Sequence, residues 1–342
     1  MDKPFKVIQF GFCHEHASGK MWTLRHFSDE FEVIGVVDDR ATKTARTNIT
    51  SFPDFEGVPV LTEEEALSNT EAEAMVVEVT NGDLVPFAMK CAERGFPMHM
   101  DKPTGETLQP FVDLVELCRA KKIHLQLGYM FRANPAVKFT HKAAREGWLG
   151  EIISAEADMN HAYGDLSYQD YLGAFKAGIL YSLGCHLVDL VLPLFGGALP
   201  LRAHPVLKTA PGDREGIANT CVSVLEWPHG TATIHASSRA TKAQPIRRLR
   251  VLGTKGWIEI CPIERFDNQP LTLQLCLSEP AGGYPAGLHT VDFGKPEDRY
   301  VDQLRELKRI VRGEIPDPGN YDNDIAVHKA VLMACGLDGQ GA

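Results

Sequence analysis

Two side chains that can handle charge and protons stand side by side at Asp101 and Lys102, directly after the short, mostly apolar residues 97–100. Such a stretch is typical of a buried strand in a parallel sheet. Ligands of open α/β sheets bind beyond the carboxyl ends of the strands, so an acid and an amine at such an end predict a site. A surface turn with a solvated lysine is the alternative interpretation.

His186 is the second candidate for proton transfer, within residues 181–189, whose sequence is YSLGCHLVD. It opens a predicted helix, and an imidazole titrates near neutral pH, so it can act as a general acid or base. The alternative is a core histidine with satisfied hydrogen bonds. Its neighbour Cys185 is most simply a small buried hydrophobic residue.

The first strand-like stretch is followed by Gly11, and the second by an acid, Asp38. This is the dinucleotide-binding pattern, in which glycines let the backbone approach the pyrophosphate at a helix N-terminus and the acid holds the ribose. A Gly-x-Gly-x-x-Gly frame laid on Gly11 puts Cys13 and His16 where the second and third glycines belong. We therefore expect the nucleotide to lie slightly farther out or to be contacted by side chains.

The type of nucleotide depends on Asp38, Asp39 and Arg40, all three of which we assign to the cofactor site. Asp38 would repel a 2′-phosphate, which favours NAD. An arginine nearby can accommodate that phosphate, so Arg40 keeps NADP as the alternative.

His14 and His16 lie two positions apart in the same loop, a spacing at which two imidazoles can share a metal ion. No third ligand with suitable spacing is present nearby, so we predict no metal site. We assign both histidines to the cofactor loop, where they face phosphate or the helix N-terminus, with a purely structural role as the alternative.

Strands alternate with helices over about the first 125 residues, which predicts a parallel, doubly wound Rossmann sheet. The expected strands are residues 6–10, 32–37, 74–79, 97–100 and 124–127, separated by helices at 19–27, from 62, 84–94 and 108–121. After a helix at 137–146 the chain becomes strand-rich, at 152–159, 221–226, 231–236, 248–252, 257–260 and 271–277, with helices at 185–194, 300–312 and 324–334. This composition predicts an α+β domain with an antiparallel sheet. We place the domains at 1–127 and 128–342, and the last helix could return toward the first domain.

The net charge of −10 argues against a nucleic-acid or anionic-membrane partner, because such binding depends on Lys and Arg. No uncharged apolar run approaches the length of a membrane span. The N-terminal residues run straight into the first strand, which leaves no room for a signal peptide. Eight cysteines without a Cys-x-x-Cys pair indicate a reducing setting, and we expect a cytoplasmic protein.

These motifs, taken in order, resemble those of the glucose–fructose oxidoreductase, inositol dehydrogenase and MocA (Gfo/Idh/MocA) family over residues 5–337. Thr80-Asn81 resembles the family's Thr-Pro-Asn, and Asp101-Lys102-Pro103 resembles its Glu-Lys-Pro. Residues 128–135, GYMFRANP, resemble the opening of its second domain, residues 183–189 resemble its Asp-x-Gly-x-His-x-x-Asp motif without the leading aspartate, and residues 321–326 resemble its final helix.

The resemblance implies a Rossmann domain followed by an α/β domain with a large open sheet, and NAD(P)-dependent oxidation or reduction of sugars and cyclitols. Thr80, Asn81, Asp101 and Lys102 would then contact the cofactor, with Asp101 fixing Lys102 beside the nicotinamide ribose. Relatives associate through the open sheet face, so we expect a homodimer or homotetramer.

Ser182 is the most informative departure, because it stands where the family has an aspartate four positions before the histidine. A serine can hydrogen-bond a hydroxyl but cannot take its proton at neutral pH. The catalytic pair would then be Lys102 and His186, which bind the reacting oxygen and exchange its proton. The other hydroxyls of the polyol are assigned, on placement alone, to Arg132, His161, Tyr163 and Ser182.

Two other functions stay open. Some relatives oxidise a sugar transiently, eliminate the glycosidic substituent and return the hydride, so that the net reaction is glycoside cleavage. The altered glycine loop and Ser182 also allow a non-catalytic sensor of a nucleotide or sugar, although Lys102 and His186 would have little use there.

Overall fold

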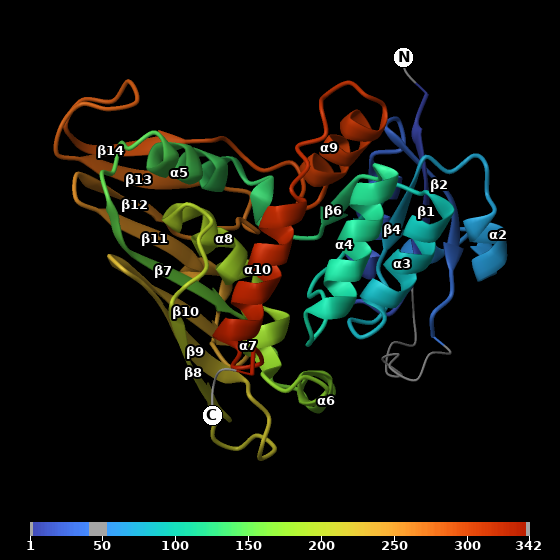
Figure 1. Cartoon of the computed structure of the whole chain (residues 1–342), viewed down its shortest axis with the longest axis horizontal. Coiled ribbons are helices and arrows are strands. Elements are labelled where there is room, and N and C mark those ends of the chain that lie inside the picture. The colour runs from blue at the N-terminus through green and yellow to red at the C-terminus, as the bar shows by residue number, and fades with distance from the viewer. Residues whose placement is uncertain (1–2, 41–52, 340–342) are drawn as a thin grey trace. The chain divides into compact units, whose positions relative to one another are not determined.

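The computed structural model describes residues 3–40 and 53–339, and the chain forms two compact units (Figure 1). Unit 1 comprises the chain up to Met130 together with Asp298–Ile325, and unit 2 comprises Phe131–Glu297 together with the chain from Ala326 onward. The chain therefore leaves unit 1 near residue 130 and contributes to it again near its end. The single division at residue 127 drawn from the sequence stays a prediction.

Unit 1 contains a six-stranded parallel sheet with the strand order β3-β2-β1-β4-β5-β6. The strands are β1 (Phe5–Phe10), β2 (Phe31–Val37), β3 (Val60–Leu61), β4 (Ala74–Val77), β5 (Met98–Met100) and β6 (Leu125–Leu127). The order of strands reverses between β1 and β4, which is the switch point where doubly wound sheets bind ligands. The predicted doubly wound parallel sheet is confirmed.

The helices of this unit are α1 (Ala17–His26), α2 (Glu63–Leu67), α3 (Leu84–Arg94), α4 (Gln109–Lys121) and α9 (Val301–Val311), with a 3₁₀ turn at Pro53–Phe55. A capping box begins α2, since Thr62 and Glu65 bond each other's backbone there. Gly95 ends α3 in the left-handed conformation, at φ 89°. The division between the units falls within the last helix, α10 (Tyr321–Ala334).

Unit 2 contains an eight-stranded sheet with the order β14-β13-β12-β11-β7-β10-β9-β8. The strands are β7 (Ile152–Asn160), β8 (Arg202–Lys208), β9 (Thr220–Trp227), β10 (Gly230–Ser237), β11 (Arg248–Gly253), β12 (Gly256–Ile260), β13 (Thr272–Leu277) and β14 (Gly287–Asp292). Of these neighbours, β7 and β10 run parallel and the others antiparallel. The predicted large, mostly antiparallel sheet is confirmed.

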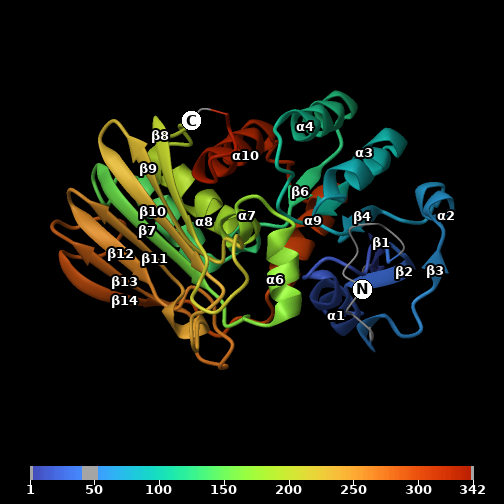
Figure 2. The same cartoon turned by 90° about the horizontal axis from the view of Figure 1, so that it is seen from below.

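The helices of unit 2 are α5 (Pro135–Arg145), α6 (Leu166–Gly173), α7 (Gly178–Ser182) and α8 (Gly184–Val191). Every residue of α8 is buried, and Figure 2 shows α7 and α8 on one face of the sheet. The helix predicted at 185–194 ends earlier, at Val191, and continues as a 3₁₀ turn, Leu192–Phe195. Pro193 explains the change, because it lacks the N–H of an α-helical hydrogen bond.

Two edge strands, β8 and β14, and two short helices, α6 and α7, were not predicted. Both strands lie at the ends of the sheet and are largely exposed on alternate positions, and β8 contains Pro205, so their apolar signal is weak. Among the described residues, no helix is long and apolar enough to cross a membrane. All eight cysteines are free thiols.

Candidate active site

The loop after β1 requires glycine at its first position. Gly11 has φ +104°, and a Cβ there would lie 2.5 Å from the backbone oxygen of Glu78. Its N–H donates to the carbonyl of Val37 over 3.0 Å. The ends of β1, β2 and β4 therefore approach each other as closely as the dinucleotide-binding pattern demands.

Cys13, at the position of the second motif glycine, is buried in a core cluster with Phe12, Ala17, Met21, Val36 and Phe55. The side chain thus lies within the core of unit 1. A thiol in the core leaves the loop surface to the backbone. The expected position of the nucleotide, slightly farther out or contacted by side chains, stays a prediction.

Two neighbouring acids at the end of β2 have different surroundings. Asp39 is buried, and its Oδ1 accepts the Phe12 N–H at 2.7 Å while its Oδ2 accepts the Thr80 N–H at 3.2 Å. Burial raises the pKa of Asp39 above its ordinary value, although the hydrogen bonds from Phe12, Cys13 and Thr80 oppose the rise. Asp39 therefore holds the loops after β1 and β4 to the end of β2.

Asp38 instead pairs with Arg40 at the surface, with N–O distances of 2.6 to 3.0 Å. The hydrogen bonds from Arg40 hold the pKa of the Asp38 carboxyl below its ordinary value. Of the two acids, Asp38 is thus the more accessible to a ribose. The guanidinium of Arg40 lies 5.0 Å from the centre of the Phe12 ring.

A buried ammonium joins the carboxyl ends of β4 and β5. Lys20 Nζ lies 3.0 Å from Glu78 Oε1, 3.1 Å from Asp101 Oδ2 and 2.6 Å from His99 Nε2. Asp101 and its neighbours hold the pKa of Lys20 above its ordinary value despite burial, and burial lowers the pKa of His99 to about 3. Sequence reasoning missed Lys20, Glu78 and His99. The sequence did offer a signal for them, because each is a polar residue within or next to an apolar stretch.

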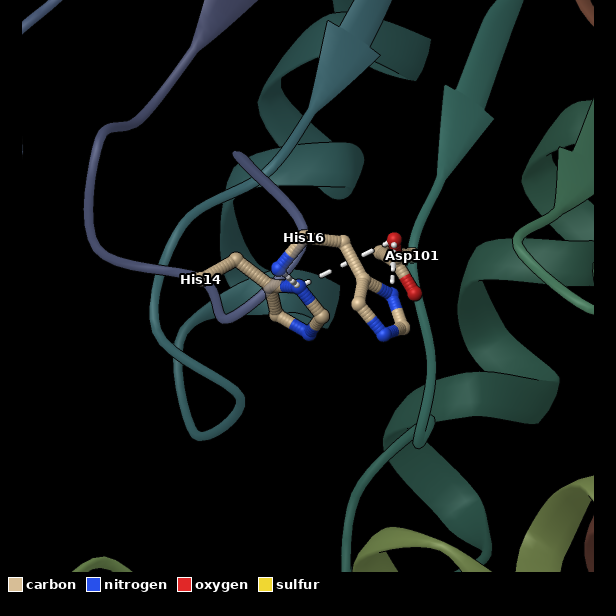
Figure 3. A group of neighbouring side chains, drawn as sticks. All are labelled: His14, His16 and Asp101. Atoms are coloured by element: carbon tan, nitrogen blue, oxygen red, sulfur yellow. Dashed lines mark hydrogen bonds and ion pairs between the residues drawn. The ribbon is translucent and has the colours of Figure 1, made fainter. Parts of the chain in front are cut away.

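His14 and His16 point into the same cluster, and Figure 3 shows both imidazoles beside Asp101. His16 Nδ1 lies 3.0 Å from Asp101 Oδ2. His14 Nε2 lies 3.0 Å from the Lys102 carbonyl, while its Nδ1 accepts the His16 N–H at 3.1 Å. The two histidines therefore connect the loop after β1 to the residues after β5.

The two histidines differ in charge. Burial lowers the pKa of His16 to about 3, so its imidazole is neutral. Burial also lowers the pKa of His14, but Asp101 and Glu78 outweigh it, and the net change is upward. Burial alone would raise the pKa of Asp101, but Lys20 and the two histidines outweigh this effect and hold the pKa well below its ordinary value. The cluster thus keeps Asp101 ionised.

Lys102 is fully buried, and its Nζ donates to Glu15 Oε1 over 3.0 Å. Asp101 Oδ1 accepts the backbone N–H of Lys102 at 2.7 Å. The resemblance implied that Asp101 fixes Lys102 beside the nicotinamide ribose. Asp101 holds the backbone of Lys102, and Glu15 from the loop after β1 pairs with the amine. Glu15 was not predicted, because nothing in its loop marks it as different from a surface acid.

Thr80 and Asn81 follow β4 and are buried beside the same loops. Thr80 Oγ1 donates to Asp83 Oδ2 over 2.8 Å, and Asn81 Nδ2 lies 3.4 Å from the Lys102 carbonyl. Unit 1 therefore brings together the predicted residues Gly11, Cys13, His14, His16, Asp39, Thr80, Asn81, Asp101 and Lys102 at the carboxyl ends of its strands.

In unit 2, His186 is buried in α8 and Ser182 is buried at the end of α7. The Phe131 ring meets the His186 imidazole edge-on, with 5.7 Å between ring centres. Arg132, predicted to bind substrate, forms a two-point ion pair with the buried carboxylate of Asp189, with its closest N–O distance 2.6 Å. Asp189 therefore fixes the guanidinium of Arg132.

The other two predicted substrate residues form a stack. The His161 and Tyr163 rings lie 4.4 Å apart between centres, and His161 Nδ1 lies 3.0 Å from an Arg247 nitrogen. Arg247 is itself buried and paired with Glu264 over 2.8 Å. His161 is thus held in place, while Tyr163 is exposed.

A Rossmann unit with charged residues gathered at its strand ends, followed by a large mixed sheet, defines a two-domain nucleotide-binding fold. Residues 137–259 match the family model for the GFO/IDH/MocA C-terminal domain. This match confirms the resemblance to the Gfo/Idh/MocA family that was drawn from the motifs.

Among curated proteins, the chain is 25% identical over 173 residues to D-apiose dehydrogenase of Paraburkholderia graminis, covering 49% of this chain and 45% of that protein. It is 26% identical over 194 residues to scyllo-inositol 2-dehydrogenase (NADP+) of Bacillus subtilis, covering 56% and 52%. The chain thus spans about half the length of the curated relatives that it matches.

Solved structures resemble the whole chain. Aldose–aldose oxidoreductase from Caulobacter crescentus, complexed with glycerol, aligns with a TM-score of 0.78 and 17% identity over 99% of this chain and 98% of that one. WlbA dehydrogenase from Chromobacterium violaceum, complexed with NADH and UDP-GlcNAcA, aligns with a TM-score of 0.74 and 16% identity over 100% and 95%. At this identity the likeness establishes the fold.

Proposed function

We propose that the protein is an NAD(P)-dependent oxidoreductase that transfers a hydride between a nicotinamide and a sugar, cyclitol or related polyol. The match to the family model supports an oxidoreductase, and its curated relatives include proteins named as dehydrogenases of apiose and of scyllo-inositol. The substrate of this chain is proposed only as a class, a compound with several hydroxyl groups.

The observation that carries the proposal is the buried amine of Lys102 at the carboxyl end of β5. Burying an ammonium is costly unless it is paired, and here Glu15 pairs with it at 3.0 Å. An ion pair kept at the edge of the sheet where such folds bind ligands is best explained by use in binding or catalysis.

The residues of unit 1 fit a dinucleotide. Gly11 allows the close approach of the backbone, the Cys13 side chain is buried in the core, and Asp38 lies at the end of β2 for the ribose hydroxyls. Asp38 favours NAD, and its partner Arg40 keeps NADP as the alternative. A bound nicotinamide would supply the acceptor or donor of the hydride.

Lys102 would polarise and orient the reacting oxygen, and His186 would exchange its proton. Ser182 would donate or accept a hydrogen bond without taking the proton. Arg132, His161 and Tyr163 would bind the remaining hydroxyls, the first two in orientations that Asp189 and Arg247 fix.

The test is nicotinamide reduction or oxidation with NAD and NADP over a panel of aldoses and cyclitols. Lys102→Ala and His186→Gln should each lower kcat on the order of 10²- to 10⁴-fold. The matched control is Lys255→Ala, which removes a surface lysine paired with Glu279 at 2.7 Å and should leave kcat unchanged. Full activity in both site variants would refute the assignment.

Glycoside cleavage through transient oxidation is the second candidate, favoured by Ser182 in place of the family's aspartate. Incubation with NAD and a chromogenic glycoside separates the two. Release of the aglycone without net reduced nicotinamide indicates cleavage, whereas accumulating reduced nicotinamide indicates the dehydrogenase. Nucleotide or sugar binding with no turnover of any substrate would point to the sensor.

The oligomeric state, the cellular location and the kinds of partner are also proposals. We propose a homodimer or homotetramer in the cytoplasm, with no nucleic-acid or membrane partner. Light scattering of the purified protein measures the assembly.

A further inference from the structure

Three side chains at the carboxyl ends of β1 and β5, those of His14, His16 and Asp101, face one another in unit 1. His14 Nδ1 lies 3.7 Å from Asp101 Oδ2 and 3.4 Å from Glu78 Oε2, and His16 Nδ1 lies 3.0 Å from the same Asp101 oxygen. The atoms offered by His14, His16 and Asp101 all lie within 4.8 Å of one another. Figure 3 shows the three side chains facing each other.

These separations suit a transition-metal ion. Nitrogen and oxygen ligands at about 2.0–2.2 Å from a tetrahedral zinc ion lie about 3.3–3.5 Å from each other. Asp101 Oδ2 lies 3.0 Å from His16 Nδ1 and 3.7 Å from His14 Nδ1, and these separations bracket that spacing. All three side chains are nearly or fully buried, so neither long arms nor loose loops have to be ordered on binding.

Two of the three groups are held by a hydrogen bond on the far side, as metal ligands are. His14 Nε2 lies 3.0 Å from the Lys102 carbonyl, and Asp101 Oδ1 accepts the Lys102 N–H at 2.7 Å. The atoms aimed at the centre are thus His14 Nδ1, His16 Nδ1 and Asp101 Oδ2.

The orientation of His14 sets a condition for metal binding. Its Nδ1 accepts the His16 N–H at 3.1 Å, and because an imidazole nitrogen has one lone pair, a metal ion would take the place of this hydrogen bond. Glu78 Oε2 lies 3.4 Å from His14 Nδ1 and adds a second buried carboxylate beside the group.

We propose that His14, His16 and Asp101 form a binding site for one divalent transition-metal ion, with zinc the best match to two imidazoles and one carboxylate that leave a fourth position open. The inference does not depend on the proposed oxidoreductase activity. It replaces the expectation of no metal, which arose because no third ligand lay near the two histidines. The fold supplies Asp101 from 85 positions farther along the chain.

Lys20 is the competing cation, since its Nζ lies 3.1 Å from the same Asp101 oxygen. A proton between His14 and Glu78 is the other way to satisfy the cluster. Either one would leave the purified protein with no affinity for zinc, so direct measurement of bound metal distinguishes them from the proposal.

The experiment uses the full chain without a histidine tag, stripped with chelator, loaded with Zn²⁺ or Co²⁺ and desalted. We expect about one equivalent of metal by mass spectrometry, a visible Co²⁺ spectrum of tetrahedral intensity, and a higher Tm on loading. His16→Gln and Asp101→Asn should lose at least nine-tenths of the bound metal and the Tm response.

The matched control is His235→Ala, which removes another histidine that lies 3.0 Å from an aspartate, Asp158, and should keep the full equivalent. Wild-type protein that retains less than about a tenth of an equivalent overturns the proposal, as does full retention by the two site variants. If a variant fails to fold, the Co²⁺ spectrum of the wild type decides. An octahedral spectrum identical to aqueous Co²⁺ rejects the site.

Discussion

Lys102 Nζ lies 3.0 Å from Glu15 Oε1, so the amine that follows β5 is paired with an acid from the loop after β1. The Lys102 side chain is fully buried, and that of Glu15 is 17% exposed. An ion pair therefore links the proposed phosphate loop to the proposed catalytic lysine. A change in either residue must alter the other.

Glu15→Gln should lower kcat about three- to tenfold, because the amide keeps a hydrogen-bond acceptor for Lys102 but loses the charge-assisted part of the bond. Steady-state kinetics with the best substrate measures it. Glu279→Gln, which disrupts the surface pair with Lys255, should change nothing. A loss as large as that of Lys102→Ala would mean that Glu15 takes part in the chemistry itself.

Gly11→Ala should destabilise unit 1 by roughly 3 kcal/mol or more, because its Cβ would lie 2.5 Å from the Glu78 carbonyl at φ +104°. Gly95→Ala is the matched control, since φ is +89° but nothing lies within 4 Å of the added atom. Its cost should be about 1 kcal/mol. Urea unfolding measures both, and equal costs would show that backbone conformation alone makes Gly11 necessary.

Arg132→Met should destabilise unit 2 by about 3 kcal/mol, because it leaves the Asp189 carboxylate buried without its two-point partner. The double variant Arg132→Met with Asp189→Leu should recover part of that loss, since no charge is then left buried. Denaturant unfolding of the wild type, both single variants and the double variant completes the cycle. Additive costs would contradict coupling between these two side chains.

Acid should weaken the sheet of unit 2 at Asp158. Burial opposes ionisation of this carboxyl, but hydrogen bonds from His235 and Arg248 outweigh it and hold its pKa below the ordinary value. A lowered folded-state pKa stabilises the fold above the ordinary carboxyl pKa, and the gain is lost as pH falls through the folded-state pKa.

Asp158→Asn should therefore cost about 1 kcal/mol near pH 6, and its difference from wild type should shrink as pH falls below the ordinary carboxyl pKa and disappear below the folded-state pKa. Unfolding free energies at several pH values measure this. Glu279→Gln is the control, because its partner Lys255 lies with it at the exposed surface and no pH-dependent difference is expected. A constant difference across the pH range would assign the Asp158 effect to packing.

The sequence predicted the parts of the fold that carry strong periodicity. Buried strands such as β4 and β7 and amphipathic helices such as α9 were found within a few residues of their bounds. The edge strands β8 and β14 were missed, because a strand with one neighbour and exposed side chains has little apolar signal.

The site was harder to predict because its partners are distant in the sequence. The motifs located Lys102 and His186, but the acid that pairs with Lys102 is 87 positions away. Lys20, Glu78 and His99 looked like isolated charges in apolar segments until the sheet brought them together. Pairing across strands is set by topology, which a single sequence specifies only indirectly.

The two aspartates at the end of β2 divide their work, with Asp39 tying loops together from inside and Asp38 facing outward beside Arg40. Under our proposal that Asp38 and Arg40 contact the nucleotide ribose, substitutions at these two positions would change the preference between NAD and NADP without loosening the loops that Asp39 secures. Evolution or a protein engineer could then alter that preference while the framework beneath stays intact.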